Sequence, residues 1–193
     1  MTNIFLAGVG GQGILLASEL ISNAALMAGF DVKKSEVHGM AQRGGSVVSA
    51  VRFGTRVYSP LITHGEADFL LAFEILEALR NVNYLKPHGK LVTSTQSIIP
   101  LSVSSGGGKM PDDIKGRLRK AVNSPIFIDA ISLAKGAGNT RTANVVLLGA
   151  LSLFVDIPEK LFIEAIKTGI KPRFVDVNIK AFKLGREAVR DYA

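Results

Sequence analysis

The sequence predicts an α/β fold: a single Rossmann-like, doubly wound domain over residues 1–193 with a mostly parallel sheet. The first reason is the β-turn-α start, in which an apolar segment at Asn3–Ala7 is followed by GVGGQG and then by a helical pattern. The second is that further short apolar segments alternate with amphipathic ones. The third is composition, because 47% hydrophobic residues and a mean hydropathy of +0.29 allow a sizeable core and exclude global disorder.

The elements follow in order along the chain. Asn3–Ala7 is the expected first strand, and the helix after it, Gly13–Ala28, has apolar residues at i, i+3 and i+4 steps that place one face on the sheet. Further strands are expected at Val32–Val37, Ser46–Phe53, Asp68–Phe73, Lys90–Ser94 and Ile126–Asp129. Further helices are expected at Glu74–Tyr84, Pro111–Val122, Thr142–Val155, Pro158–Thr168 and Phe174–Arg190. Ser102–Lys109, rich in serine and glycine, is expected to be a mobile loop.

The residue types present exclude several kinds of site. The chain has no cysteine and only three histidines, whereas iron–sulfur clusters are held by thiolates and closed zinc sites use several Cys or His ligands. We therefore expect no metal site here and an electron-transfer centre, if there is one, on another chain. The net charge of +7 is spread along the chain without an aromatic-interleaved basic patch. This pattern argues against nucleic acid and suits a phosphate-rich cofactor or an acidic partner.

Hydropathy argues against a membrane span. The longest apolar runs, such as Val145–Leu148 and Phe69–Phe73, are far shorter than the roughly 18–20 residues that a span needs. No basic region precedes Ile4–Val9, and the glycines that follow would interrupt the apolar part of a signal peptide. The sequence therefore predicts a cytoplasmic protein.

The glycine-rich segment is the first candidate binding site. Gly8, Gly10 and Gly13 satisfy G-x-G-x-x-G between a strand and a helix, and Gly11 adds a further position without a Cβ. Glu36, near the end of the second strand, stands where a ribose-binding acid would stand in a dinucleotide site. Backbone N–H groups of such a loop can surround an anion, and the alternative is a tight strand-to-helix turn.

A second polar segment, EVHGMAQRGGS, has no place in a plain dinucleotide domain. It contains His38, Gln42 and Arg43, with Gly44 and Gly45 directly after them. Another segment, GGGKM, fails as a phosphate loop because Met110 occupies the position of the required Ser or Thr.

Together, GVGGQG and EVHGMAQRGGS resemble the gamma domain of the 2-oxoacid:ferredoxin oxidoreductases, and the form HGMAQRGG resembles the beta subunits of the indolepyruvate branch of that family. The resemblance covers nearly the whole chain, since ADFLLAFEILEALR, GNTRTANVVLLGALS and VDVNIKAFKLGRE also match in place. One departure is Ser94, where the family pattern leads us to expect asparagine at the end of the fifth strand.

The resemblance implies a subunit of an enzyme that decarboxylates aryl pyruvates such as indolepyruvate, forms an acyl-coenzyme A and reduces ferredoxin. Such enzymes use thiamine diphosphate with magnesium, and iron–sulfur clusters. Neither a GDG segment followed by Asn nor any cysteine is present in this chain. The resemblance thus implies that no cofactor is bound by this chain alone, that no catalytic residue lies on it, and that a larger, cysteine-containing subunit carries both groups. The high apolar fraction predicts dependence on that partner, or a homodimer when the chain is isolated.

Each candidate binding residue has an alternative role. Gln12 is a candidate for bonding a ligand or the partner, and Arg43 for binding carboxylate or phosphate, with a salt bridge as its alternative. His38 is a candidate acid/base group or a hydrogen-bonded structural residue. Asn139 and Asn144 are candidates for holding backbone or cofactor groups, and Asn139 is also a possible helix cap.

Three functions from different classes stay open at this point. They are a non-redox subunit of a thiamine-dependent oxidoreductase, a free-standing NAD- or FAD-binding oxidoreductase, and a scaffold protein with a degenerate loop. In a doubly wound sheet the segments after the first and second strands emerge at one edge, so GVGGQG and HGMAQRGG are expected to be neighbours. We expect this edge, with Arg43, to position coenzyme A in the intact enzyme.

Overall fold

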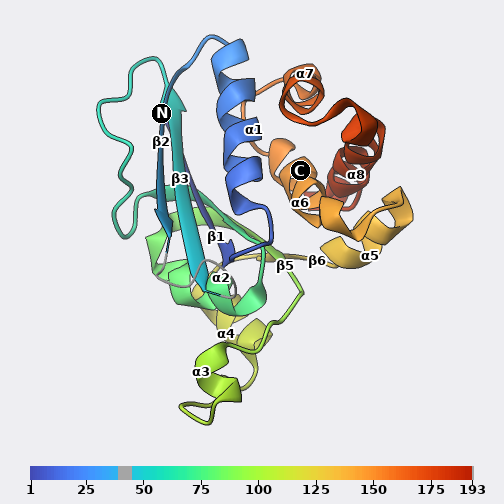
Figure 1. Cartoon of the computed structure of the whole chain (residues 1–193). Helices are drawn as coiled ribbons and strands as arrows, with labels where there is room; N and C mark the ends of the chain where they lie inside the picture. The colour runs from blue at the N-terminus through green and yellow to red at the C-terminus, as the bar shows by residue number, and fades with distance from the viewer. Residues whose placement is uncertain (39–44, 193) are drawn as a thin grey trace.

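The computed structural model describes residues 1–38 and 45–192 of the chain. Within them, six strands form one sheet in the order β2-β3-β1-β4-β5-β6 (Figure 1). The strands are β1 Thr2–Val9, β2 Asp31–His38, β3 Ser46–Gly54, β4 Ala67–Ala72, β5 Leu85–Ser94 and β6 Ile126–Ile128. The neighbours β1, β4, β5 and β6 run parallel, whereas β3 is antiparallel to both β1 and β2. The predicted α/β fold with a mostly parallel sheet is confirmed.

Helices cover both faces of this sheet. They are α1 Ile14–Met27, α2 Ile75–Asn81, α3 Leu101–Ser104, α4 Ile114–Ala121, α5 Ala130–Ala137, α6 Ala143–Ser152, α7 Glu159–Gly169 and α8 Val175–Glu187. Figure 1 shows α1 and α5–α8 on one side, with α2 and α4 on the other. Four short 3₁₀ segments are Val82–Tyr84, Thr140–Thr142, Pro172–Phe174 and Arg190–Tyr192. No helix in the described part of the chain has the length and apolarity to cross a bilayer.

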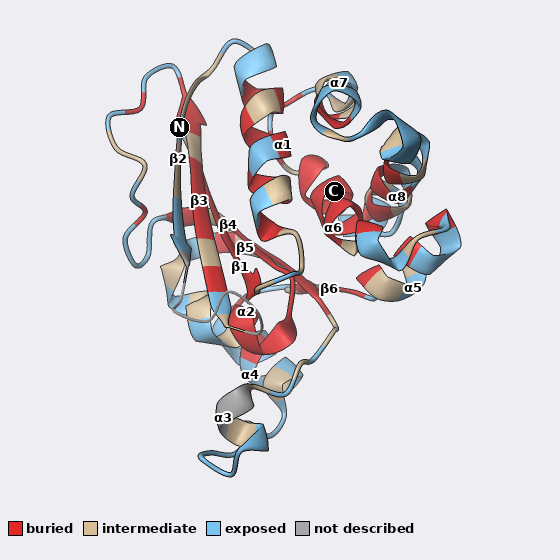
Figure 2. Cartoon of the chain, in the orientation of Figure 1, coloured by how far each residue is buried: buried red, intermediate tan, exposed pale blue. Residues whose placement is uncertain are grey.

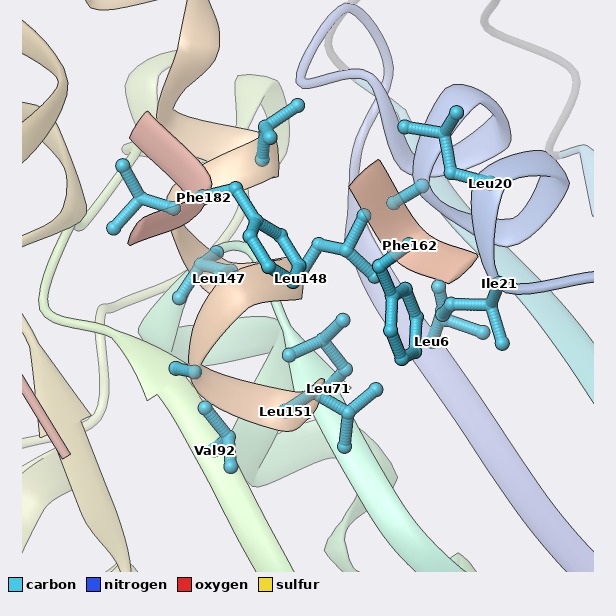
Figure 3. Close-up of a cluster of buried hydrophobic side chains, with 14 of the residues drawn as sticks. Leu6, Leu20, Ile21, Leu71, Val92, Leu147, Leu148, Leu151, Phe162 and Phe182 are labelled. Carbon is cyan, nitrogen blue, oxygen red and sulfur yellow. The ribbon is translucent and has the colours of Figure 1, made fainter. Parts of the chain in front are cut away.

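The larger core lies between the sheet and the helices α1 and α5–α8. Figure 3 shows Leu71 and Val92 of the sheet facing Leu148 of α6, with Phe182 on one side of Leu148 and Phe162 on the other. Nine of the ten residues of α6 are buried, because this helix is enclosed by the sheet and by α8 (Figure 2). The largely apolar sequence of α6, ANVVLLGALS, agrees with this enclosed position.

Two glycines let α6 and α8 touch through their backbones. A Cβ at Gly149 would collide with the carbonyl oxygen of Phe182, and one at Gly185 with that of Val146. The crossing thus requires hydrogen at both positions and fixes α6 against the C-terminal helix.

Several predicted boundaries need correction. α5 was not expected; Asp129 caps it by accepting a hydrogen bond from the Ser132 backbone N–H at 3.0 Å, and Gly138 ends it with φ of 116°. The start of Ser102–Lys109, predicted as a loop, belongs to α3. β5 begins at Leu85 rather than at Lys90, and the helix predicted to reach Tyr84 ends at Asn81.

Candidate functional site: a cavity at the carboxyl edge of the parallel strands

The glycine loop between β1 and α1 depends on glycine at three described positions for two different reasons. Gly11 and Gly13 have φ of 101° and 78°, in the left-handed region that favours glycine. Gly8 instead lies in a tight space, since a Cβ there would be 2.9 Å from both Gln12 Oε1 and Phe73 Cβ. The loop is a constrained strand-to-helix turn whose backbone can approach a ligand closely.

Gln12 joins the ends of three strands. Its Oε1 accepts a hydrogen bond from the Val9 backbone N–H at 2.8 Å. Its Nε2 donates to the Phe73 carbonyl and to Gln96 Oε1, both at 3.0 Å. Both amide protons are therefore used inside the chain, and Gln12 fixes the glycine loop to the segments that follow β4 and β5.

The two predicted asparagines lie close to the same loop. Asn144, 4% exposed at the start of α6, donates from Nδ2 to the Gly13 carbonyl at 3.2 Å. A Cβ at Gly13 would lie 2.5 Å from that nitrogen, so the contact also needs glycine. Asn139 caps the following 3₁₀ segment by accepting from the Arg141 backbone N–H at 3.0 Å. The cap role that the sequence left open for Asn139 is thus present.

These residues border a cavity of about 580 Å³. Gly11, Gln12, Gly13 and Asn144 from the predicted set line it, together with Ser94, Gln96 and Arg141, which sequence reasoning did not select as site residues. A smaller cavity of about 360 Å³ adjoins it, shares Leu16, Arg141 and Asn144, and includes Asn139. The polar cavity therefore continues into a more apolar one lined also by Ile170 and Phe174.

The larger cavity is suited to an anion. The residues around it include Gly13, Ala130 and Ala143, which stand at the starts of α1, α5 and α6. Helix N-termini carry unpaired N–H groups and a partial positive charge. Arg141 adds a full positive charge, and none of the described lining residues is acidic. At the start of α5, the N-cap carboxylate of Asp129 already accepts hydrogen bonds from the backbone N–H and hydroxyl of Ser132, which lower its pKa, so this helix start contributes less positive charge than those of α1 and α6.

Two buried glutamates, one before and one in α2, bind neighbouring segments at the carboxyl edge of the parallel strands. Glu74, 1% exposed, accepts backbone hydrogen bonds from Glu77 at 2.8 Å and Ile98 at 3.0 Å, and burial raises its pKa. Glu77, 2% exposed, accepts from the Ser46 hydroxyl and from Arg80, both at 2.6 Å. Through Ser46, α2 is fixed to the start of β3.

The second predicted glycine segment meets the first at one described point. The Gly10 backbone N–H donates to the Gly45 carbonyl at 2.9 Å, so Gly45 lies beside the glycine loop as expected. Gln42, Arg43 and Gly44 lie outside the described residues, and so does the side chain of His38. Their predicted roles stay predictions. In the described part of the chain, no group of three or more His, Asp or Glu side chains is placed to hold a metal ion.

Comparison with known proteins gives consistent results. The family model described as pyruvate ferredoxin/flavodoxin oxidoreductase matches residues 3–188. The chain is 45% identical to the indolepyruvate oxidoreductase subunit IorB of Thermococcus kodakarensis, and 45% identical to that of Pyrococcus horikoshii. Each match covers 98% of this chain and 96% of the relative. A keto/oxoacid ferredoxin oxidoreductase gamma subunit from Geobacter sulfurreducens has a similar structure, with a TM-score of 0.75, 25% identity and 99% of each chain covered.

Proposed function

Because the chain belongs to the pyruvate ferredoxin/flavodoxin oxidoreductase family, as a gamma-type subunit, we propose that its carboxyl-edge cavity binds the phosphate-bearing part of coenzyme A in an indolepyruvate-oxidising complex. A larger subunit in that complex carries thiamine diphosphate, magnesium and the iron–sulfur clusters. The complex oxidatively decarboxylates aryl pyruvates and passes the electrons to ferredoxin. The near full-length match to oxidoreductase subunits does not favour a free-standing NAD or FAD enzyme or a scaffold.

One observation carries the assignment of coenzyme A to this chain. Three helix starts and Arg141 border one cavity of about 580 Å³ whose described lining has no acidic side chain. Phosphate groups are stabilised by helix N-termini and by the planar fork of arginine. The adjoining cavity, which Ile170 and Phe174 line together with polar side chains, offers room for an uncharged arm beyond the phosphates. Coenzyme A supplies the thiol that accepts the acyl group, and this chain binds and orients it.

Replacing Arg141 tests the proposal. Loss of one charge-assisted hydrogen bond costs about 1.5–3 kcal/mol, which is roughly a 10- to 150-fold loss of affinity. In the intact complex, Arg141→Ala should raise the KM for coenzyme A by that factor and leave the KM for the 2-oxoacid nearly unchanged. The matched control is Arg117→Ala, which removes an exposed arginine of α4. Normal assembly with unaltered coenzyme A dependence would show that the cavity does not bind it.

Arg43→Ala is expected to act in the same direction as Arg141→Ala, because the Gly10–Gly45 contact places the start of β3 beside the glycine loop.

The isolated chain should show no turnover with thiamine diphosphate, coenzyme A, indolepyruvate and a viologen acceptor. Turnover like that of the complex would contradict the assignment of the redox groups to a partner.

A further inference from the structure

β2 forms an open edge of the sheet. It is the terminal strand in the order, and none of the residues that the structure describes pairs with its outer side. Its eight residues contrast with the three of β6 at the opposite edge. A strand of this length with an unpaired row of N–H and C=O groups can add a further strand. Lysines usually discourage such pairing, so the charges on β2 decide what it can accept.

Symmetric pairing of β2 with a second copy of itself restricts the register. Residues that face each other across an antiparallel pair point to the same side of the sheet, whereas neighbours along one strand point to opposite sides. A two-fold axis must therefore pass beside a single residue that faces its own copy. Centring on Lys33, Lys34 or Glu36 would set like charges opposite each other, which is destabilising. Centring on a residue nearer either end of β2, such as Val32 or Val37, would pair at most three of its eight residues with the other copy.

A register centred on Ser35 has complementary charges instead. Lys34 of each copy then faces Glu36 of the other, which gives two identical cross-strand ion pairs. Within one chain, Lys34 Nζ already lies 2.6 Å from Glu19 and 3.0 Å from Glu36. The second copy would extend these three groups into a network of both copies. The pairing thus gives Lys34 and Glu36 partners of opposite charge in the other copy.

The opposite side of the strand offers apolar surface for the same contact. Val37 is 60% exposed and Leu61 is 64% exposed, and both line one groove with Ser35. In the Ser35-centred register, Lys33 of the second copy faces Val37, and its aliphatic stem can cover the valine. From these observations we infer that the chain forms a homodimer through antiparallel β2–β2 pairing centred on Ser35, with one continuous sheet across both copies. This inference is independent of the proposed coenzyme A site.

Charge variants of the full chain test the register. Lys34→Glu places only carboxylates at positions 34 and 36, and Glu36→Lys places only amines there. Each variant alone should self-associate at least about tenfold more weakly than the wild type, since two attractive pairs become repulsive. An equimolar mixture of the two variants should recover the dimer. Residues 34 and 36 are both acidic in one variant and both basic in the other, so every facing pair in the mixed dimer has opposite charges. Sedimentation velocity at several concentrations gives the dissociation constants.

An engineered cysteine gives a second measurement that does not depend on charge. The chain has no cysteine, so Ser35→Cys introduces a single thiol beside the proposed two-fold axis. Facing residues of an antiparallel pair are close enough for a disulfide, and mild oxidation should yield a covalent dimer. Lys120→Cys, exposed on α4, should remain monomeric on a denaturing gel. A wild type that stays monomeric, a dimer indifferent to the charge variants, or equal cross-linking of the two cysteine variants would each overturn the inference.

Discussion

The parallel and antiparallel halves of this sheet present different chemistry, the first at the carboxyl ends of its strands and the second along the outer side of its terminal strand. In the parallel half, β1 and β6 are each followed by a helix whose start borders the cavity, so backbone N–H groups and Arg141 gather there. In the antiparallel half, β2 connects to β3 without a described helix, and β2 instead has an unpaired outer side and carries charges of both signs. The comparison teaches that helix starts favour the proposed anion site, whereas an unpaired strand offers the proposed surface for a second copy.

The largest expected effect comes from removing the helical support of the parallel half. Gly185→Ala would push a methyl group into the Val146 carbonyl, so α6 and α8 would have to separate. We expect the free energy of unfolding in urea to fall by about 3 kcal/mol or more. The control is Gly136→Ala in α5, where a Cβ meets nothing within 4 Å and should stabilise the helix by about 0.5–1 kcal/mol. Similar small effects of both changes would contradict a backbone-to-backbone crossing.

A second, smaller effect should follow from releasing the glycine loop. Gln12→Ala removes three hydrogen bonds that join the ends of β1, β4 and β5. We expect a loss of about 2 kcal/mol in unfolding free energy and a higher KM for coenzyme A in the complex. Gln96→Ala, which removes one of the three, should lose about 1 kcal/mol. An unchanged KM for coenzyme A in the Gln12→Ala complex would show that the position of the glycine loop does not affect ligand binding.

A pH series sharpens the comparison without altering the cavity lining. Burial raises the pKa of Glu74, so the folded state holds its proton to a higher pH than the unfolded state does. The contribution of Glu74 is therefore fully present below its ordinary pKa and declines as pH rises through the raised value. The stability of the wild type relative to Glu74→Gln should fall over that window. A flat difference between the two proteins would mean that the backbone N–H groups of Glu77 and Ile98 offset the burial.

The smallest effect is expected in the antiparallel half. Burial lowers the pKa of Lys34, but its hydrogen bonds to Glu19 and Glu36 raise it by more. Partly exposed ion pairs contribute little, so Lys34→Ala should change the unfolding free energy by less than about 1 kcal/mol while it weakens the proposed dimer. The change in unfolding free energy is measured on its own when both proteins are unfolded at a concentration where the wild type is monomeric. A large loss there would make Lys34 a folding residue rather than an interface residue.

The sequence was informative wherever a local pattern decides the structure. The strand–glycine–helix start predicted β1, α1 and the positions of Gly11 and Gly13, whose φ angles demand glycine. The direction of β3 was not predicted, although the short segment between Val37 and Ser46 is too brief for the crossover that a parallel neighbour needs. Asp129 and Gly138 are typical residues for the two ends of a helix, but α5 was not predicted because the apolar pattern between them is short.

Only part of the site could be predicted from the sequence, because the site forms from segments that lie far apart in the chain. Gln12 and Asn144 were selected from motifs, yet their roles depend on Phe73, Gln96 and Gly13, which no spacing connects to them. Arg141 was missed because it follows a cap and has no glycine-rich frame of its own. The one available signal was the segment GNTRTAN, which contributed to the family resemblance as a whole.

The buried α6 also has a consequence for when the protein can fold during synthesis. The larger core joins Ile4 of β1 to Phe182 of α8, so it includes residues near both ends of the chain. A core built from such distant contacts closes late, since loop-closure entropy is lost before the contacts form. On the ribosome, α6 emerges before α8, the helix that shields it, and the apolar surface of α6 stays uncovered on that side until α8 has emerged as well. We expect nascent chains that end before α8 to depend on chaperones, whereas chains that include α8 can close this core.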